Sequence, residues 1–257
     1  HYAATKAYIL SLAEGLNYEF KDKNVDVLAL CPGFTKSEMT KGLKDSPMLM
    51  EAAPVVQVLH EKNLQLAGIL VTHHHPDHTG GIVELLQHHR VPVYGPCNSP
   101  TRKLISHVLK DGDCISLGGI EFSVIAVPGH TLDHIAFYSA VENILLCGDT
   151  LFSAGCGRVF EGTHEQMYES LLKLAALPGD TKFYCAHEYT LANLLFAIAV
   201  EPDNQDIIQY QRQCEAIRAK NLPTLPSTIA LEKKINPFLR CNNALQFSER
   251  RRQKNNF

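Results

Sequence analysis

The chain has 257 residues, of which 45% are hydrophobic, so it is long enough for one large domain or two ordinary ones with a buried core. Its formal charge of -3 gives no overall attraction to nucleic acid or to an anionic membrane surface. No apolar run approaches the roughly 20 residues that a membrane-spanning helix needs. We therefore expect a globular protein that binds neither nucleic acid nor membranes.

Eight cysteines are scattered along the chain without CxxC pairs, which does not match a disulfide scaffold. This usage favours a reducing, cytoplasmic compartment. The chain opens on His1 rather than Met, and its first residues lack the basic start and apolar run of a secretory signal. We expect the natural start to lie upstream.

The first 50 residues predict one helix followed by one strand. Apolar residues recur at helical spacing over 3–20, and the run NVDVLALC over 24–31 is typical of a buried strand that ends at Pro32-Gly33. A polar, Lys-rich stretch over 39–47 separates this unit from a second predicted helix over 53–62. We place a domain boundary near residue 50.

From Leu66 the pattern changes to short apolar runs separated by Gly, Pro and Asp, which is typical of sheet strands. The predicted strands are LAGILVT, VPVYG, CISL, IEFSVIAV, HIAFYS, NILLCG and KFYCA. Helical periodicity covers 80–89 and 163–177, and Thr163 with Gln166 has the pattern of a capping box. After Tyr189 two helices and a basic tail follow, so we predict a strand-rich domain over 51–188 and a helical subdomain over 189–257.

The loop THHHPDH over 72–78 follows a predicted buried strand and carries several side chains that bind metals. Imidazole nitrogens and carboxylate oxygens are ligands of divalent ions such as zinc, and so many on one short loop cannot all reach a single tetrahedral ion. Three more candidates, His130, Asp149 and His187, each come just after an apolar strand. A single His at a strand end is more often structural, but this recurrence favours one shared site for two ions.

The pattern HxHxDH, then GH, GD and AH, resembles the metallo-β-lactamase superfamily of hydrolases. The resemblance implies an α/β fold, an αββα sandwich, here incomplete at its N-terminal strands and extended by the helical subdomain. It also implies that one metal is held by His73, His75 and His130, that the other is held by Asp77, His78 and His187, and that Asp149 bridges them. Asp77 and Asp149 are therefore the candidate catalytic carboxylates.

Within that superfamily, the runs GDTLFSAGCGRVFEGT, HEYTLANLLFA, NPFLR and RRRQK resemble glyoxalase II, the hydroxyacylglutathione hydrolases, from about Glu51 to the end of the chain. The resemblance implies two divalent ions, Zn first with Fe or Mn as alternatives, and hydrolysis of S-D-lactoylglutathione to glutathione and D-lactate in methylglyoxal detoxification. We expect a monomer, with self-association possible. The glutathione contacts that it implies are Arg158, Phe160, Tyr189, Arg251 and Lys254, with Phe160 standing where some members have Tyr.

This chemistry suits a thioester. Two cations bridged by a carboxylate lower the pKa of a shared water towards about 7, so that hydroxide is available to attack the thioester carbonyl. The departing thiol has a pKa near 8.5 and needs little or no protonation. Cationic side chains at the pocket rim would hold the two carboxylates of glutathione.

The segment 1–47 resembles the C-terminal part of a short-chain dehydrogenase. Tyr2 and Lys6 stand where that family has its proton-transfer pair, and CPGFT follows at the expected place. No glycine-rich dinucleotide loop precedes them, so we expect no dehydrogenase activity. The segment replaces the opening strands of a glyoxalase II, and loss of edge strands would favour self-association.

Two other functions are open at this point. The chain could be a superfamily relative with different chemistry, such as a lactonase, a β-lactamase or an iron-dependent persulfide dioxygenase, or it could be an inactive fusion. Among nearby residues, we expect His74, Pro76, His88 and His89 to point away from the metals. His134 could orient a ligand or only pack, and Cys185 is expected to be buried and inert.

Overall fold

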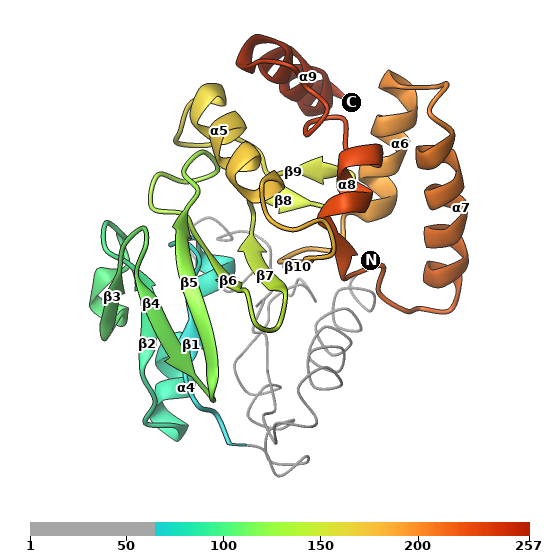
Figure 1. The fold of residues 1–257 in the computed structure, drawn as a ribbon. Helices are drawn as coiled ribbons and strands as arrows, with labels where there is room; N and C mark the ends of the chain where they lie inside the picture. The colour runs from blue at the N-terminus through green and yellow to red at the C-terminus, as the bar shows by residue number, and fades with distance from the viewer. Residues whose placement is uncertain (1–64) are drawn as a thin grey trace, which may run out of the picture.

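The structure is a computed structural model that describes residues 65–257. The helix, strand and second helix predicted within 1–64, and the Tyr2 and Lys6 pair, lie outside the described residues. The described part contains two facing β-sheets flanked by helices, with a group of helices at one end (Figure 1).

The smaller sheet joins three parallel strands, β1 (Ile69–Leu70), β2 (Val93–Pro96) and β3 (His107–Leu109). Successive residues of a strand point to opposite faces, so each strand serves two layers. Ile69 and Val93 pack against α4 (Ile82–His88), while Leu70 and Tyr94 pack on the main core. The short helix α3 (Pro76–Thr79) lies between β1 and α4.

The larger sheet has six strands in the order β11-β10-β7-β6-β5-β4. They are β4 (Cys114–Leu117), β5 (Ile120–Ala126), β6 (Ile135–Ser139), β7 (Ile144–Gly148), β10 (Lys182–Cys185) and β11 (Ser227–Thr228). The helix α5 (His164–Ala175) connects β7 to its parallel neighbour β10 and buries Met167, Leu171 and Leu174 in the main core. The layer order is therefore helix, sheet, sheet, helix, which confirms the predicted αββα sandwich.

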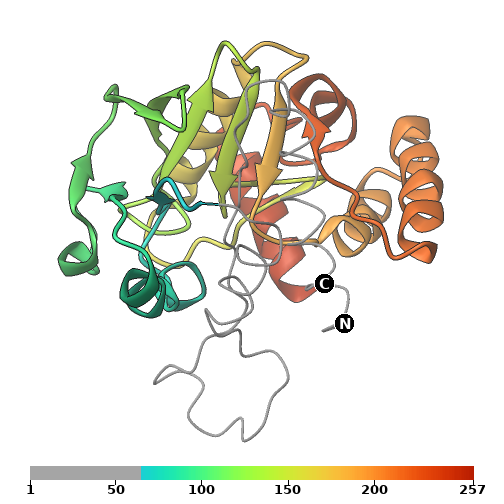
Figure 2. The same cartoon turned by 90° about the horizontal axis from the view of Figure 1, so that it is seen from below.

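The C-terminal part is helical. It contains α6 (Thr190–Val200), α7 (Gln205–Ala219), α8 (Ile229–Ile235) and α9 (Ala244–Asn256), and Figure 2 shows α6 and α7 at one side of the larger sheet, opposite the three-stranded sheet. A hairpin of β8 (Leu151–Phe152) and β9 (Gly155–Cys156) lies between the sheet and these helices. No helix of the described residues is long and apolar enough to cross a membrane.

Most of the predicted helices and strands of the described residues are present. The capping box at Thr163 and Gln166 is present, and both helices predicted after Tyr189 are formed. The run LAGILVT forms only a two-residue strand. The sequence pattern did not predict β3, β8, β9 or β11, because two- and three-residue strands are too short to show a periodicity.

Candidate metal centre

The strand directions bring three of the candidate residues to one edge of the larger sheet. Because β6 is antiparallel to both β5 and β7, and β10 is parallel to β7, the strands β5, β7 and β10 all end at the same edge. His130, Asp149 and His187 follow these three ends. The fourth contribution comes from the loop after β1, which is joined to the start of β6 by a hydrogen bond from the Ile135 N–H to the Thr72 carbonyl, 2.9 Å.

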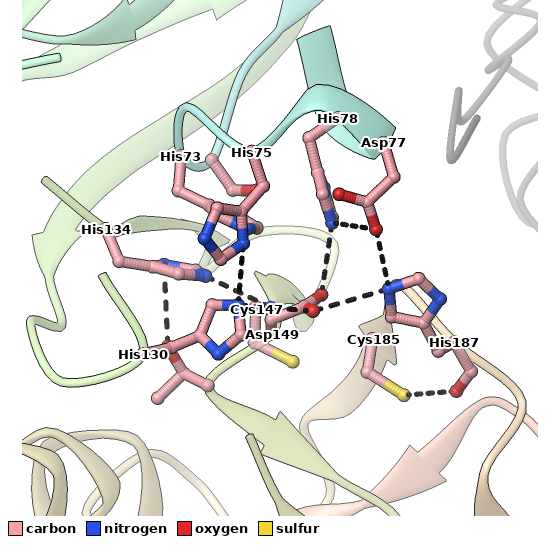
Figure 3. A network of polar contacts seen from close by, with 12 residues as sticks. His73, His75, Asp77, His78, His130, His134, Cys147, Asp149, Cys185 and His187 are labelled. Carbon is pink, nitrogen blue, oxygen red and sulfur yellow. Dashed lines mark hydrogen bonds and ion pairs between the residues drawn. The ribbon is translucent and has the colours of Figure 1, made fainter. Parts of the chain in front are cut away.

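The seven candidate ligands meet around one centre, as Figure 3 shows. On one side, the Nδ1 atom of His75 lies 3.1 Å from Nε2 of His73 and 3.0 Å from Nε2 of His130. On the other side, the Nε2 atom of His187 lies 3.4 Å from Oδ2 of Asp77. Their ligand atoms form groups that could hold metal ions, among them His73, His75 and His130, and separately Asp77, His78 and His187.

Asp149 lies between these two groups. Its Oδ2 atom is 3.5 Å from Nε2 of His130 and 3.3 Å from Nε2 of His187, and its Oδ1 atom is 3.3 Å from Nε2 of His78. One carboxylate therefore faces imidazoles of both groups. A side chain in this place can contact two ions at once.

The electrostatics of the two groups differ. Burial lowers the pKa of His73, His75 and His130, so these imidazoles are held neutral, the form that binds a metal. Burial alone would also lower the pKa of His187, but the adjacent Asp149 raises it well above its usual value. Burial alone would raise the pKa of Asp149. The imidazoles of His187 and His78 outweigh this effect and hold its pKa well below the usual value.

Neighbouring groups orient the ligands. The Nδ1 atom of His130 is 2.7 Å from the Arg158 carbonyl, so it donates there and leaves Nε2 to face the cluster. The buried His134 accepts a hydrogen bond from the Asp149 N–H at Nε2, 3.0 Å, and its ring stacks on His73. Burial lowers the pKa of His134 to about 3. The structure therefore shows both a hydrogen bond to a candidate ligand and a packing contact.

The outer residues of the site lie close to both groups. The exposed Phe160 ring contacts the rings of His75 and His130, with centroids 5.7 and 5.3 Å away. The Arg158 guanidinium lies over the Phe160 ring, 5.8 Å from its centroid. Across the cluster, the half-exposed Tyr189 stacks on the ring of His187 at 5.0 Å. Two aromatic rings thus border the metal ligands.

The two basic residues of α9 are less open. Arg251 is only 5% exposed and donates from Nη1 to the carbonyl of Cys156 in β9, 2.9 Å. Lys254, one turn later, donates to the carbonyl of Ala192 in α6, 2.9 Å, and burial lowers its pKa to about 8. Arg251 is therefore covered by the protein, whereas the partly buried Lys254 uses one of the three donors of its ammonium group.

Comparisons with known proteins agree with this site. Residues 38–96 and 98–187 match the Metallo-beta-lactamase superfamily, and residues 188–257 match the family described as Hydroxyacylglutathione hydrolase C-terminus. A hydroxyacylglutathione hydrolase from Nitrosomonas eutropha is 52% identical over 194 residues, which is 75% of this chain and 75% of the relative. The chain belongs to the hydroxyacylglutathione hydrolase family. Another hydroxyacylglutathione hydrolase, from Yersinia pestis, is 53% identical over 193 residues, or 75% of this chain and 76% of its own length.

The family membership confirms the resemblance to glyoxalase II seen in the sequence motifs. Residues 1–47 match the short chain dehydrogenase family, which confirms the resemblance of that segment. The chain therefore joins pieces that are similar to two unrelated families.

Solved structures share the fold. The structure of ETHE1 from Myxococcus xanthus has a TM-score of 0.59 and 25% identity, covering 78% of this chain and 75% of that one. BLEG-1, a B3 metallo-beta-lactamase, has a TM-score of 0.54 and 23% identity over 74% of this chain and 85% of its own. TTHA1623, solved in a di-iron-bound form, has a TM-score of 0.51 and 22% identity over the same shares.

Proposed function

We propose that the chain is a metal-dependent thioesterase that hydrolyses S-(2-hydroxyacyl)glutathione, such as S-D-lactoylglutathione, to glutathione and a 2-hydroxy acid. The observation that carries this proposal is the meeting of seven metal-binding side chains from four loops in a member of the hydroxyacylglutathione hydrolase family. We place catalysis in residues 51–188 and part of the substrate site in 189–257, and the reaction in the cytoplasm of the cell. The free cysteines of the described residues support a reducing compartment.

Two unsatisfied atoms at the centre support metal binding. Within the described part of the chain, Nε2 of His78 and Oδ1 of Asp149 are buried and have no hydrogen-bond partner, although they are 3.3 Å apart. Buried polar atoms without a partner are costly, and a cation between a lone pair and a carboxylate oxygen would satisfy both. The residues therefore fit a metal.

We propose two ions, one held by His73, His75 and His130 and the other by Asp77, His78 and His187, with Asp149 shared. Nitrogen and oxygen donors of this kind accept Zn, Fe or Mn, and we propose Zn because borderline ligands with three imidazoles suit it. When bound, such ions lower the pKa of a water molecule and polarise a carbonyl oxygen.

The residues of the chain then direct the reaction. Water attacks the thioester carbonyl carbon, the carbon–sulfur bond breaks, and glutathione departs as a thiolate that takes up the proton. Asp77 is the more exposed of the two carboxylates in the cluster, with 24% of its side chain accessible. Its Oδ2 faces His78 and His187, and we propose that its other oxygen accepts a hydrogen bond from the attacking water. Asp149 is held by the hydrogen bond from its N–H to the His134 ring, and His130 is held by its hydrogen bond to the Arg158 carbonyl.

We propose that glutathione lies along the outer residues of the site. Phe160 and Tyr189 border the two metal groups and would exclude water from the reacting thioester. Arg158, which is exposed, and Lys254 would bind the glutathione carboxylates. The buried Arg251 would contribute indirectly, because its hydrogen bond fixes α9 to β9 and so keeps Lys254 close to the substrate site.

The test is hydrolysis of S-lactoylglutathione by the metal-replete protein. We expect steady turnover that a chelator abolishes and zinc restores. A metal-replete chain without thioesterase activity would contradict the proposal, and release of sulfite from glutathione persulfide by an iron-loaded chain would favour a dioxygenase instead.

A further inference from the structure

His74 is the one imidazole of the loop 73–75 whose ring nitrogens both face carboxylates. Its Nδ1 atom lies 2.9 Å from Oδ1 of Asp133, and its Nε2 atom lies 3.1 Å from Oε1 of Glu161. The contact with Asp133 is a hydrogen bond, and the contact with Glu161 is within ion-pair distance. The Asp133 side chain is 2% exposed and that of Glu161 is 36% exposed, so the ring spans from the interior to the rim.

These three residues belong to three different loops of the site. His74 lies between two metal-ligand candidates, Asp133 lies in the loop that carries His130, and Glu161 follows Phe160. Each carboxylate is also fixed from the second loop, since Thr131 Oγ1 donates to Asp133 Oδ1 at 2.7 Å and the Leu132 N–H donates to Glu161 Oε2 at 2.9 Å. The ring thereby closes a network across all three loops.

We propose that His74 is a positioning residue that sets the separation of the His73–His75 loop, the His130 loop and the Phe160 loop through its hydrogen bond to Asp133 and its contact with Glu161. The proposal rests on the thioesterase function above. The bond to Asp133 acts on the metal ligands, because it holds the backbone beside His130. The contact with Glu161 affects substrate binding, because it holds the backbone beside the ring of Phe160.

Because Asp133 is buried and Glu161 is partly exposed, loss of the contact of His74 with each of them should have a different effect. Loss of the His74 ring leaves Asp133 buried with a missing donor, and a buried carboxylate tolerates this poorly. Glu161 is partly exposed, and water replaces the lost donor. Substitution of Asp133 should therefore lower metal affinity and kcat, and substitution of Glu161 should mainly raise KM.

Four variants of the full, metal-replete chain test this division. Asp133→Asn is expected to lower metal affinity and kcat by about tenfold or more, the range found for groups that orient metal ligands. Glu161→Gln is expected to raise KM for S-lactoylglutathione about fivefold with a smaller change in kcat, because the contact of the carboxylate with His74 is weakened. His74→Phe should show both effects. His88→Asn, at the exposed end of α4, is the matched control and should match the wild type.

Metal affinity is measured by competition with a chromophoric chelator, which needs no turnover. If the wild type binds metal but hydrolyses no thioester, the proposed function fails while the order of metal affinities still tests His74. His74→Asn provides a rescue, because its amide nitrogen can take the place of Nδ1 and keep the bond to Asp133; it should recover metal affinity but not KM. The proposal is overturned if His74→Phe matches His88→Asn in metal affinity, kcat and KM, or, should His74→Phe not fold, if Glu161→Gln leaves KM unchanged.

Discussion

The metal cluster and the helical part that borders it use polar side chains in opposite ways. In the cluster, the imidazoles and carboxylates contact one another, and two of their buried atoms have no hydrogen-bond partner among the described residues. In the C-terminal helices, Arg251 and Lys254 donate to backbone carbonyls, and the buried Glu232 accepts four hydrogen bonds. The difference indicates that the cluster can bind a ligand. The polar side chains of the helices instead fix α8 and α9 against the hairpin of β8 and β9 and against α6.

The largest effect is expected from the shared carboxylate. Replacing Asp149 by Ala removes the contact between the two groups, so at least one ion should be released. Because groups that only orient a ligand cost 10–100-fold, loss of a shared ligand should lower kcat by more than about 100-fold. Metal analysis and hydrolysis of S-lactoylglutathione measure both results. Retention of two ions at full rate would refute the bridging assignment.

A second pair of variants compares the two metal groups with each other. His187→Asn removes a ligand of only the second group, so we expect one ion per chain to remain and the rate to fall by about 100-fold or more. His75→Asn should remove the other ion instead. Stoichiometry from elemental analysis distinguishes these outcomes. Release of both ions from His187→Asn would mean that the groups bind metal only together.

Glu232 tests the supporting role of the helices. Its carboxylate accepts from Ser153 and Ser227 at one oxygen and from the Ala154 N–H and Asn236 at the other. Glu232→Ala leaves buried donors without a partner and should cost about 3–5 kcal/mol of unfolding free energy. Glu232→Gln should cost less than about 1.5 kcal/mol, because the two serine hydroxyls can turn and accept hydrogen bonds from the new amide nitrogen.

The pH dependence of Glu232 follows from the direction of its shift. Burial outweighs the four hydrogen bonds and raises the pKa of Glu232. A carboxyl group whose pKa is raised in the folded state binds its proton more tightly there, so stability falls as the pH rises from the usual carboxyl pKa through the folded value. Glu232→Gln should remove this part of the decline. Urea unfolding of both proteins over this pH range measures it, and equal slopes would contradict the shift.

The smallest effect is expected from Lys254. Lys254→Met should raise KM about tenfold with kcat nearly unchanged, because one charge-assisted contact to glutathione is lost. The pKa of Lys254 is lowered to about 8, so its positive charge is lost as the pH rises through that value. The KM of the wild type should therefore rise above pH 8, and that of the variant should not. A KM that is the same in both proteins would remove Lys254 from the substrate site.

The sequence was informative where the chemistry is local. His73, His75, Asp77 and His78 stand within six residues, and each of the other three candidates follows a long apolar strand, so the pattern alone could suggest that they meet. The contacts of His74 with Asp133 and of Glu232 with Ser153 could not be found in this way, because these partners lie 59 and 79 residues away along the chain. A lone Asp133 or Glu161 has the pattern of an ordinary surface charge. For His74 the expectation that it only points away was too simple.

The basic tail shows the same limit in another form. A run of arginines and a lysine at the end of a helix predicts cations at a pocket rim, but it does not show which residue is buried. In the structure Arg251 is covered and Arg252 is exposed, because only one face of α9 packs on β9 and α6. Helical periodicity becomes informative here only when the packed neighbours are known.

We propose that seven side chains hold a pair of divalent ions that serve thioester hydrolysis. The most direct test counts ions per chain by elemental analysis in the same samples in which S-lactoylglutathione hydrolysis is followed, during stepwise removal and return of zinc. We expect two ions per chain in the active protein. Activity should be lost when the ions are removed and regained when they are returned. A folded chain that binds no divalent ion, or that hydrolyses the thioester equally well without one, would contradict the claim.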